Sequence, residues 1–370
     1  MKIVAACDSF KGSLTSAEAG RSAALGAGRA GAQAVHVPIG DGGEGTVAAL
    51  VAAMGARTVS CNAVDALNRP ICAEYAISEK AAVIEVAAAI GLPRLSAGER
   101  NPWVTTSRGV GMMIADALAR GCRRITVALG GSATNDAGMG ALEALGFAFR
   151  DARGNVLCGC GGALAQVETV DTSGVNPLLA DAELTLCCDV RNAAYGPEGC
   201  AAVFAPQKGA DAAMVRALDG GMRNFAEKVG DEFFCRPGSG AAGAIGATLC
   251  ALCGARMVDG ADMVLDACGF DSLIKDADLI ITGEGRIDAQ TLMGKAPAAV
   301  LARGLRAGVP VVAVAGQVSD RQRLLDAGFA DVLRTADPAQ PLAVSMCAQV
   351  AMRGIEEAVF RFLHKSMPDV

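Results

Sequence analysis

Histidine is nearly absent from this 370-residue chain, which contains only His36 and His364. A Ser-His-Asp hydrolase, a Cys-His nucleophile pair or a multi-histidine metal site would have to use one of these two residues. His36 lies in a strand-like run and His364 lies near the C-terminus, so we expect both at the surface. Imidazole-based catalysis is therefore not expected.

The chain also lacks a basic excess, aromatic residues and long apolar runs. It has 33 Lys and Arg against 39 Asp and Glu, a net charge of −6, which disfavours a protein held on nucleic acid by phosphate neutralisation. No uncharged apolar run approaches the roughly 20 residues of a membrane-spanning helix. Aromatic residues make up 4% of the chain, whereas glycine alone occurs 46 times. Small residues let helices pack closely on a sheet, which favours a layered α/β protein.

Fourteen cysteines are present, but their spacing does not favour a metal site. Cys187 and Cys188 are adjacent, and Cys250 and Cys253 form a single Cys-x-x-Cys pair within a helix-like run. Free cysteine packs as a small hydrophobic residue, and the N-terminus begins with a strand rather than a signal peptide. We therefore expect buried thiols in a reducing, cytoplasmic compartment, with a zinc site as the less favoured alternative.

Strand and helix patterns alternate along the chain. Strands are expected near residues 1–8, 33–40, 125–129, 184–188, 279–282, 311–315 and 332–333. Residues 58–83 instead predict an antiparallel hairpin. The predicted fold is a two-domain α/β protein, in which a doubly wound parallel-sheet domain (1–70 and 256–370) is interrupted by a second, mixed α/β domain (71–255).

Four expected strand ends run into polar, glycine-rich turns, at 8–13, 41–46, 130–136 and 283–288. Free amides at a helix N-terminus attract anions, whereas carboxylates in the same turns would repel a phosphate unless a cation intervened. One such turn is most often a capped helix. Four of them indicate a site for a magnesium-bound nucleotide. The basic residues near these turns are Lys11, Arg108, Arg286 and Lys295.

Two nucleotide-binding patterns match only weakly. Gly294-Lys295 lacks the earlier glycine of a Walker A loop. The segment 238–243 fits Gly-x-Gly-x-x-Gly, but it follows Pro237 rather than a strand. We therefore interpret this segment as a flexible loop leading into a close-packed helix, and NAD binding is disfavoured.

Seven motifs occur in order along nearly the whole chain. They are 8–14 (DSFKGSL), 41–46 (DGGEGT), 105–109 (TTSRG), 130–136 (GGSATND), 188–190 (CDV), 204–209 (FAPQKG) and 283–288 (GEGRID). This set resembles the bacterial glycerate kinase family. The resemblance implies a two-domain α/β enzyme that phosphorylates D-glycerate with ATP at an active site in the cleft between the domains. Mg²⁺ is the cofactor expected from the acidic turns. The implied product is 2-phosphoglycerate, with 3-phosphoglycerate left open.

Phosphoryl transfer requires mainly positioning and charge neutralisation. Asp189 is the predicted base that orients the glycerate hydroxyl, although Asp8 or Asp41 could take this role. Lys11 and Lys295 would neutralise the transferred phosphoryl group, and Arg108 would bind the glycerate carboxylate through two parallel hydrogen bonds. The predicted substrate- or phosphate-binding residues are Asp8, Ser9, Gly42, Gly43, Gly130, Gly131, Ser132, Thr134, Asn135, Gly283, Glu284 and Arg286. The predicted Mg²⁺ ligands are Asp41 and Asp288.

Two other functions remain as alternatives. Segment 238–243 could belong to an NAD-dependent 2-hydroxy acid dehydrogenase, which would bind NADH tightly. A non-catalytic sugar-acid sensor would bind glycerate without turning over ATP. For each of these three functions we expect a small-molecule ligand and no nucleic acid or membrane partner. A homodimer is one candidate assembly.

Overall fold

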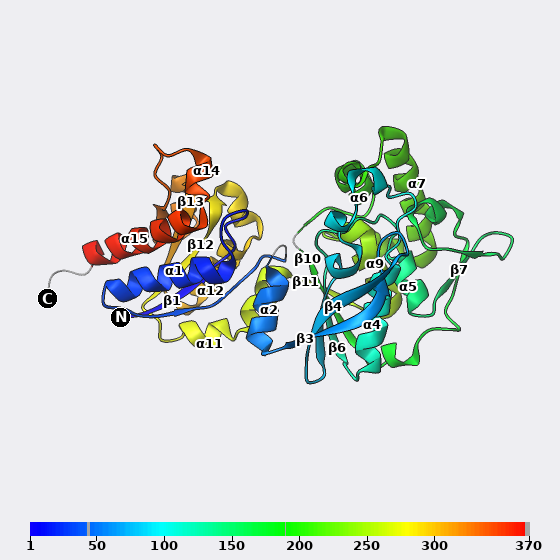
Figure 1. The fold of residues 1–370 in the computed structure, drawn as a ribbon, viewed down its shortest axis with the longest axis horizontal. Helices are drawn as coiled ribbons and strands as arrows, with labels where there is room; N and C mark the ends of the chain where they lie inside the picture. Colours follow the sequence, from blue (N-terminus) through cyan, green and yellow to red (C-terminus); the bar gives the residue numbers. More distant parts are fainter. Residues whose placement is uncertain (43–44, 189, 367–370) are drawn as a thin grey trace. The chain divides into compact units, whose positions relative to one another are not determined.

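The structure is a computed structural model that describes residues 1–42, 45–188 and 190–366 (Figure 1). Its contacts separate the chain into two compact units. Unit 1 contains residues 1–54 and the chain from residue 259 onward, and unit 2 contains residues 55–258. The expected cleft between two domains remains a prediction.

Unit 1 is built on a five-stranded parallel sheet with the order β14-β13-β12-β1-β2. Its strands are β1 (Lys2–Cys7), β2 (Gln33–His36), β12 (Leu279–Ile287), β13 (Val311–Val318) and β14 (Asp331–Arg334). The central strand β1 is buried from Ile3 to Cys7. The strands expected in this part of the sequence are confirmed, and the parallel pairing agrees with the predicted fold class.

One expectation in unit 1 is wrong. The segment 283–288 was expected to be a turn, but β12 continues through Ile287 before a short 3₁₀ helix begins. The reason is its pairing with β13, because Glu284 lies opposite Ala315 and Arg286 lies opposite Gln317. The ladder of backbone hydrogen bonds therefore outweighs the local preference of the two glycines for a turn.

Helices cover the unit 1 sheet. They are α1 (Ser16–Arg29), α2 (Thr46–Met54), α10 (Gly260–Ala267), α11 (Phe270–Ile274), α12 (Ala296–Ala307), α13 (Arg321–Asp326), α14 (Leu342–Ser345) and α15 (Ala348–Ser366). Helix α1 begins with the predicted capping box between Thr15 and Glu18. It packs side by side with α15 (Figure 1), and this contact is so close that a Cβ atom at Gly26 would lie 2.3 Å from the Glu356 carbonyl oxygen.

Unit 2 contains a six-stranded mixed sheet with the order β11-β10-β6-β5-β4-β3. Its strands are β3 (Arg57–Val64), β4 (Pro70–Ser78), β5 (Ala81–Glu85), β6 (Arg124–Ala128), β10 (Glu183–Cys188) and β11 (Arg256–Asp259). Strands β3 and β4 form the predicted antiparallel hairpin, while β5, β6 and β10 are parallel. A small antiparallel sheet that the sequence did not predict contains β7 (Ala148–Arg150), β8 (Val156–Leu157) and β9 (Thr169–Asp171).

The helices of unit 2 enclose a separate apolar core. They are α3 (Ala87–Ile90), α4 (Arg108–Ala119), α5 (Met139–Ala144), α6 (Cys200–Phe204), α7 (Ala212–Val229), α8 (Asp231–Phe234) and α9 (Ala241–Cys253). Short 3₁₀ helices cover Leu92–Arg94, Ala97–Glu99, Gly161–Gln166, Pro177–Leu179 and Pro206–Lys208, with Ala289–Met293 in unit 1.

The Gly-x-Gly-x-x-Gly segment follows α8 and leads into α9, so it lacks the preceding strand of a dinucleotide-binding fold. Gly243 has a φ of +71°, and a Cβ atom there would lie 2.3 Å from the Thr134 carbonyl oxygen. Glycine is therefore required by close packing against the 130–136 loop. This geometry gives no support to the dehydrogenase reading.

No disulfide bond joins any of the fourteen cysteines within the described chain, and their burial is mixed. Cys7, Cys61, Cys122, Cys187, Cys188 and Cys200 are buried, as expected for core residues. The expectation of uniformly buried thiols is wrong for Cys72, Cys158, Cys235 and Cys347, which are exposed. None of the helices in the described part of the chain is both long and apolar enough to span a membrane.

Candidate functional site

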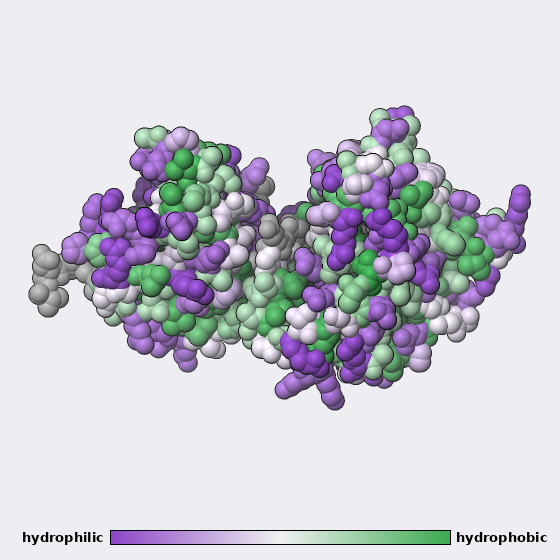
Figure 2. Space-filling model, in the orientation of Figure 1, coloured by the Kyte–Doolittle hydropathy of each residue, from purple (hydrophilic) through white to green (hydrophobic). Residues whose placement is uncertain are grey.

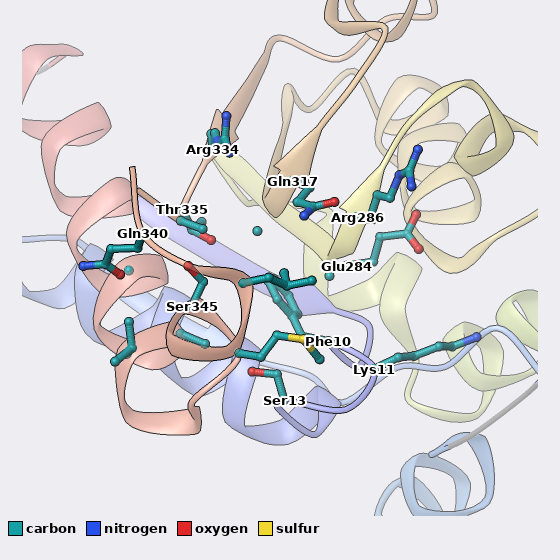
Figure 3. Close-up of a pocket in the computed structure, with 18 of the residues that line it drawn as sticks. Phe10, Lys11, Ser13, Glu284, Arg286, Gln317, Arg334, Thr335, Gln340 and Ser345 are labelled. Atoms are coloured by element: carbon teal, nitrogen blue, oxygen red, sulfur yellow. The ribbon is translucent and has the colours of Figure 1, made fainter. Parts of the chain in front are cut away.

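A cavity of about 600 Å³ lies at the carboxyl ends of the unit 1 strands (Figure 3). Parallel strands bring the residues at their carboxyl ends together, however far apart these are in sequence. Here Asp8 follows β1, and its backbone N–H donates to the carbonyl oxygen of Gly283 in β12 (2.8 Å). The predicted site residues that line the cavity are Ser9, Lys11, Glu284, Arg286 and Lys295.

Three carboxylates interact around the end of β1. Asp8 is only 2% exposed, and one of its oxygens accepts a hydrogen bond from the Ser9 backbone N–H (2.7 Å). Burial, together with the negative charges of Asp41 and Glu284, raises the pKa of Asp8 to about 8, while this hydrogen bond and Lys11 oppose the shift. At neutral pH this carboxyl group therefore carries a proton unless a cation balances the cluster.

Two lysines at the carboxyl edge of the unit 1 sheet are positioned so that they could bind phosphate oxygens. Lys295 Nζ lies 2.9 Å from Glu284 Oε2, and the other oxygen of Glu284 accepts from the Thr291 hydroxyl (2.7 Å). Lys11 is 62% exposed, with its Nζ 4.0 Å from Asp41 Oδ2, so its ammonium group is accessible to a ligand. The buried hydroxyl groups of Ser9 and Ser13 have no hydrogen-bond partner within the described chain and can donate to a bound anion.

Arg286 and Asp288 form an ion pair (3.3 Å) next to this cluster. Asp288 also caps the 3₁₀ helix Ala289–Met293 by accepting from the Gln290 N–H. Arg286 is 64% exposed and lines the cavity. The structure thus gives Asp288 a local structural role, and its binding of Mg²⁺ stays a prediction.

The oxygen donors here suit a Mg²⁺ ion that is held partly by substrate phosphates and water better than a metal ion that is held by protein side chains alone. Within the described ranges no three His, Cys, Asp or Glu side chains are grouped so that they could hold a metal by themselves. Mg²⁺ is usually held by one or two carboxylates together with substrate phosphates and water. Asp8 fits this requirement, because a cation would stabilise the ionised form that burial and its acidic neighbours disfavour.

A second group of predicted residues lies in unit 2, on the loop after β6. Lys208 is buried at 3% exposure, and its Nζ donates to the Ser132 hydroxyl (3.1 Å) and the Thr134 carbonyl oxygen (2.6 Å). Burial lowers the pKa of Lys208 to about 8. The Thr134 hydroxyl and the Asn135 side-chain nitrogen are buried without a partner within the described chain, so both are available to a ligand.

Asp136 joins this loop to the segment that precedes α4. Its carboxylate accepts from the backbone N–H and the hydroxyl of Ser107 (both 2.7 Å) and from the N–H groups of Gly138 and Gly140. The Ser107 hydroxyl accepts in turn from the Ala141 N–H (3.0 Å). Because Asp136 is fully buried, this network fixes where α4 begins relative to the 130–136 loop.

Arg108 is the first residue of α4, where the helix dipole disfavours a cation unless an anion is close. Its guanidinium lies 3.6 Å from Glu143 Oε2, a carboxylate whose pKa burial raises to about 7. The Arg108 side chain is 48% exposed and can therefore also bind a ligand carboxylate.

The structure thus places the predicted residues in two groups. Unit 1 holds Asp8, Ser9, Lys11, Asp41, Gly42, Gly283, Glu284, Arg286, Asp288 and Lys295, and unit 2 holds Arg108, Gly130, Gly131, Ser132, Thr134 and Asn135. Gly43 and Asp189 lie outside the described residues.

A profile of the glycerate kinase family matches residues 3–364. The chain belongs to the glycerate kinase family. It is 42% identical to a glycerate kinase from Bacillus subtilis (strain 168) over 327 residues, 86% of each chain. It is 41% identical to a glycerate 2-kinase from Escherichia coli (strain K12) over 328 residues, again 86% of each chain. A crystal structure assigned as glycerate kinase 2 from Salmonella typhimurium LT2 superimposes with a TM-score of 0.86 at 36% identity and covers 99% of this chain and 98% of its own.

Sequence reasoning about this glycerate kinase family member did not select Lys208, which the structure places against the predicted site residues Ser132 and Thr134, although Lys208 lies in the 204–209 motif. The sequence did contain an indication of this role, because a lysine among apolar residues and glycine is costly to bury unless its ammonium group is hydrogen-bonded. The cavity residues from 317 to 354 carried no comparable signal, since they form no glycine-rich or acidic motif.

Replacing Lys208 by methionine is expected to lower kcat roughly 10- to 100-fold, because the 130–136 loop loses its anchor. The folded-state pKa of about 8 is below the unfolded value of about 10.4, so wild-type stability rises with pH between these values. Wild-type activity should fall over the same range as the charged hydrogen bonds weaken. Both trends should be absent from K208M in pH profiles of kcat and of urea unfolding.

Lys228 provides the control for this prediction, since it is an exposed lysine on α7 in the same unit. K228M should keep both wild-type pH trends. Indistinguishable pH profiles for wild type and K208M would show that Lys208 does not position the loop.

Proposed function

We propose that this chain transfers the γ-phosphoryl group of ATP to D-glycerate and that the 2-hydroxyl is the acceptor. The cavity at the carboxyl edge of the unit 1 sheet carries the proposal, because accessible lysines, unpartnered hydroxyls and a carboxylate cluster meet there. A magnesium-bound polyphosphate requires this combination of groups. The E. coli relative named glycerate 2-kinase supports the 2-hydroxyl as acceptor.

In this proposal the unit 1 residues bind the triphosphate. Lys11 and Lys295 neutralise the charge that develops on the transferred group, while Ser9 donates a hydrogen bond. Asp8 and Asp41 hold Mg²⁺, which neutralises phosphate charge when it is bound. Phosphate oxygens would compete with Glu284 for Lys295, so binding of ATP loosens an ion pair that the structure shows intact.

The unit 2 residues bind the acceptor. Arg108 pairs with the glycerate carboxylate, and the free donors of Thr134 and Asn135 bind its hydroxyl groups. Asp189 accepts the proton of the attacking hydroxyl. A bond forms between that oxygen and the γ-phosphorus while the bond from phosphorus to the bridging β,γ-oxygen breaks, which yields phosphoglycerate and ADP.

Phosphorus NMR of the protein with Mg-ATP and D-glycerate tests the proposal directly. We expect ADP and a phosphomonoester signal that matches authentic 2-phosphoglycerate, with no such signal from L-glycerate. A 3-phosphoglycerate signal would keep the kinase and reverse the choice of hydroxyl. Folded protein that forms no ester with glycerate would contradict the proposed function. The cytoplasmic location and the homodimer stay predictions.

A further inference from the structure

The unit 1 cavity extends well beyond the residues that would bind phosphates. Its volume of about 600 Å³ is typical of a site for a whole small-molecule ligand. In Figure 3 the charged residues Lys11, Glu284 and Arg286 lie at one end and Gln340 lies at the other. Phe10 and Gln317 lie between these two ends. The cavity is therefore elongated and differs in chemistry from one end to the other.

The end away from the lysines combines apolar side chains with a few polar groups. Its apolar residues are Leu342, Met346, Val350 and Ala351, and its polar residues include Thr335, Gln340 and Ser345. The charged residues Arg334 and Asp337, which flank Thr335 in the sequence, also line the cavity. Apolar walls with a small number of hydrogen-bonding groups are typical of pockets that bind an aromatic ring. An amide side chain such as that of Gln340 can both donate to and accept from the edge of a purine base.

Apolar side chains on this side of unit 1 are unusually accessible. Leu342 is 58% exposed and Met346 is 38% exposed, and Figure 2 shows apolar residues gathered on the surface over α14. Large accessible apolar groups next to a cavity usually mark a surface that a ligand covers. Here the ligand would continue from the phosphate-binding end of the same cavity.

Backbone contacts fix the walls of this end. The Thr335 N–H donates to the Ala315 carbonyl oxygen (2.8 Å), and Gly354 packs so closely on Thr335 that a Cβ atom would lie 2.5 Å from the Thr335 carbonyl oxygen. On the opposite side Met346 reaches the Phe10–Leu14 turn, where its methyl carbon lies 3.1 Å from the position of a Cβ atom on Gly12. The pocket is thus formed before a ligand binds.

We propose that the nucleoside half of ATP binds at this end of the unit 1 cavity. The base lies against Leu342 and Met346 with its edge toward Gln340, and Thr335 lies on the ribose side. This places the triphosphate toward Ser9, Lys11 and Lys295. The proposal rests on the proposed function, since it identifies where the phosphoryl donor of that reaction is recognised.

A bulky side chain inside the pocket tests the proposal. Ser345 lines the cavity, whereas the neighbouring Val344 on the same short helix is 44% exposed and does not line it. In S345F we expect the Kd for ADP, measured by calorimetry, and the KM for ATP to rise at least tenfold, with an unchanged KM for glycerate. In V344F, the matched control, both nucleotide constants should stay within twofold of wild type. Equal constants in wild type and S345F would overturn the proposal.

Hydrogen exchange of the wild-type protein with and without ADP provides a second test that needs no variant. We expect ADP to protect backbone amides in 335–346 and in the 10–14 turn. Protection that leaves 335–346 unchanged would overturn the proposal even if S345F failed to fold. A wild-type protein that binds ADP with this protection but forms no phosphoglycerate would instead contradict the proposed function and leave the nucleoside pocket in place.

Discussion

Replacing Asp8 by asparagine is expected to lower kcat by about 10²–10³-fold, the cost of removing one preorganised electrostatic contact to a reacting group. Asparagine keeps the shape of the side chain and its oxygen can still accept from the Ser9 N–H. It removes the negative charge that we assign to Mg²⁺ and phosphate positioning. The loss should therefore appear in turnover rather than in folding, and steady-state kinetics at saturating Mg-ATP will measure it.

The stability of D8N should differ from that of wild type in a defined pH range. The pKa of Asp8 is about 8 in the folded protein and about 3.9 in an unfolded chain. The folded state therefore binds the extra proton between these values, and the wild-type free energy of unfolding decreases as pH rises from about 4 to about 8 without Mg²⁺. In D8N this contribution is absent, so the variant should be about as stable as wild type at pH 4 and increasingly more stable as pH rises to 8.

Mg²⁺ provides a further readout for the same variant. Added Mg²⁺ should raise the melting temperature of the wild-type protein, because the ion binds the ionised carboxylates of the folded state. D8N should show a much smaller rise. D326N, which changes an exposed aspartate of unit 1, should behave as wild type in all three measurements. Wild-type turnover and an equal Mg²⁺ response in D8N would contradict the role assigned to Asp8.

Replacing Asp136 by alanine is expected to destabilise the protein by about 2–4 kcal/mol. The substitution leaves the Ser107 hydroxyl and three backbone N–H groups without their acceptor in a fully buried position. Each unsatisfied buried donor costs roughly 1–3 kcal/mol. Removal of a buried carboxyl group, whose pKa burial raises, offsets part of this cost. Urea unfolding at pH 7 will measure the difference.

S107A is the graded comparison for this variant, since it removes one hydroxyl and leaves the three backbone donors to Asp136 in place. It should cost about 1–2 kcal/mol, because Asp136 loses one donor and the buried Ala141 N–H loses its acceptor. Both variants should also raise the KM for glycerate, because Arg108 and the 130–136 loop lose their fixed relation. If D136A and S107A cost the same, the backbone donors would not depend on the Asp136 carboxylate.

The sequence predicted the parts of the fold that depend on local pattern. The strand end at Asp8, the capping box of α1 and the hairpin of 58–83 each follow from neighbouring residues, and each is present. The strand expected over 33–40 is shorter than predicted, because β2 ends at His36. The segment 283–288 differed because its conformation depends on β13, a strand distant in sequence. Local glycine content cannot report such pairing.

The candidate site was predictable to a similar degree. The glycine-rich motifs predicted residues at one end of the unit 1 cavity, the end to which we assign the phosphates, and the family resemblance covers the same residues. Gln340 and Ser345 reach this cavity only because the sheet order places β14 next to β13 and α14 after it. Polar residues on a loop and a short helix look like any exposed segment until the tertiary structure is known. The role of Lys208 likewise became clear only from its partners.

The assembly of unit 1 from both ends of the chain affects how the protein folds as it is synthesised. Strand β1 pairs with β12, and the first contact of this pairing joins Ile3 to Leu279. At roughly 5–20 residues per second, β1 leaves the ribosome about 15–60 s before its partner strand is made. Unit 2, which is continuous, can fold in that interval. The apolar strand β1 therefore lacks its central neighbour during that interval, and its residues Ile3 to Cys7, which are buried in the finished sheet, stay exposed to association with other chains.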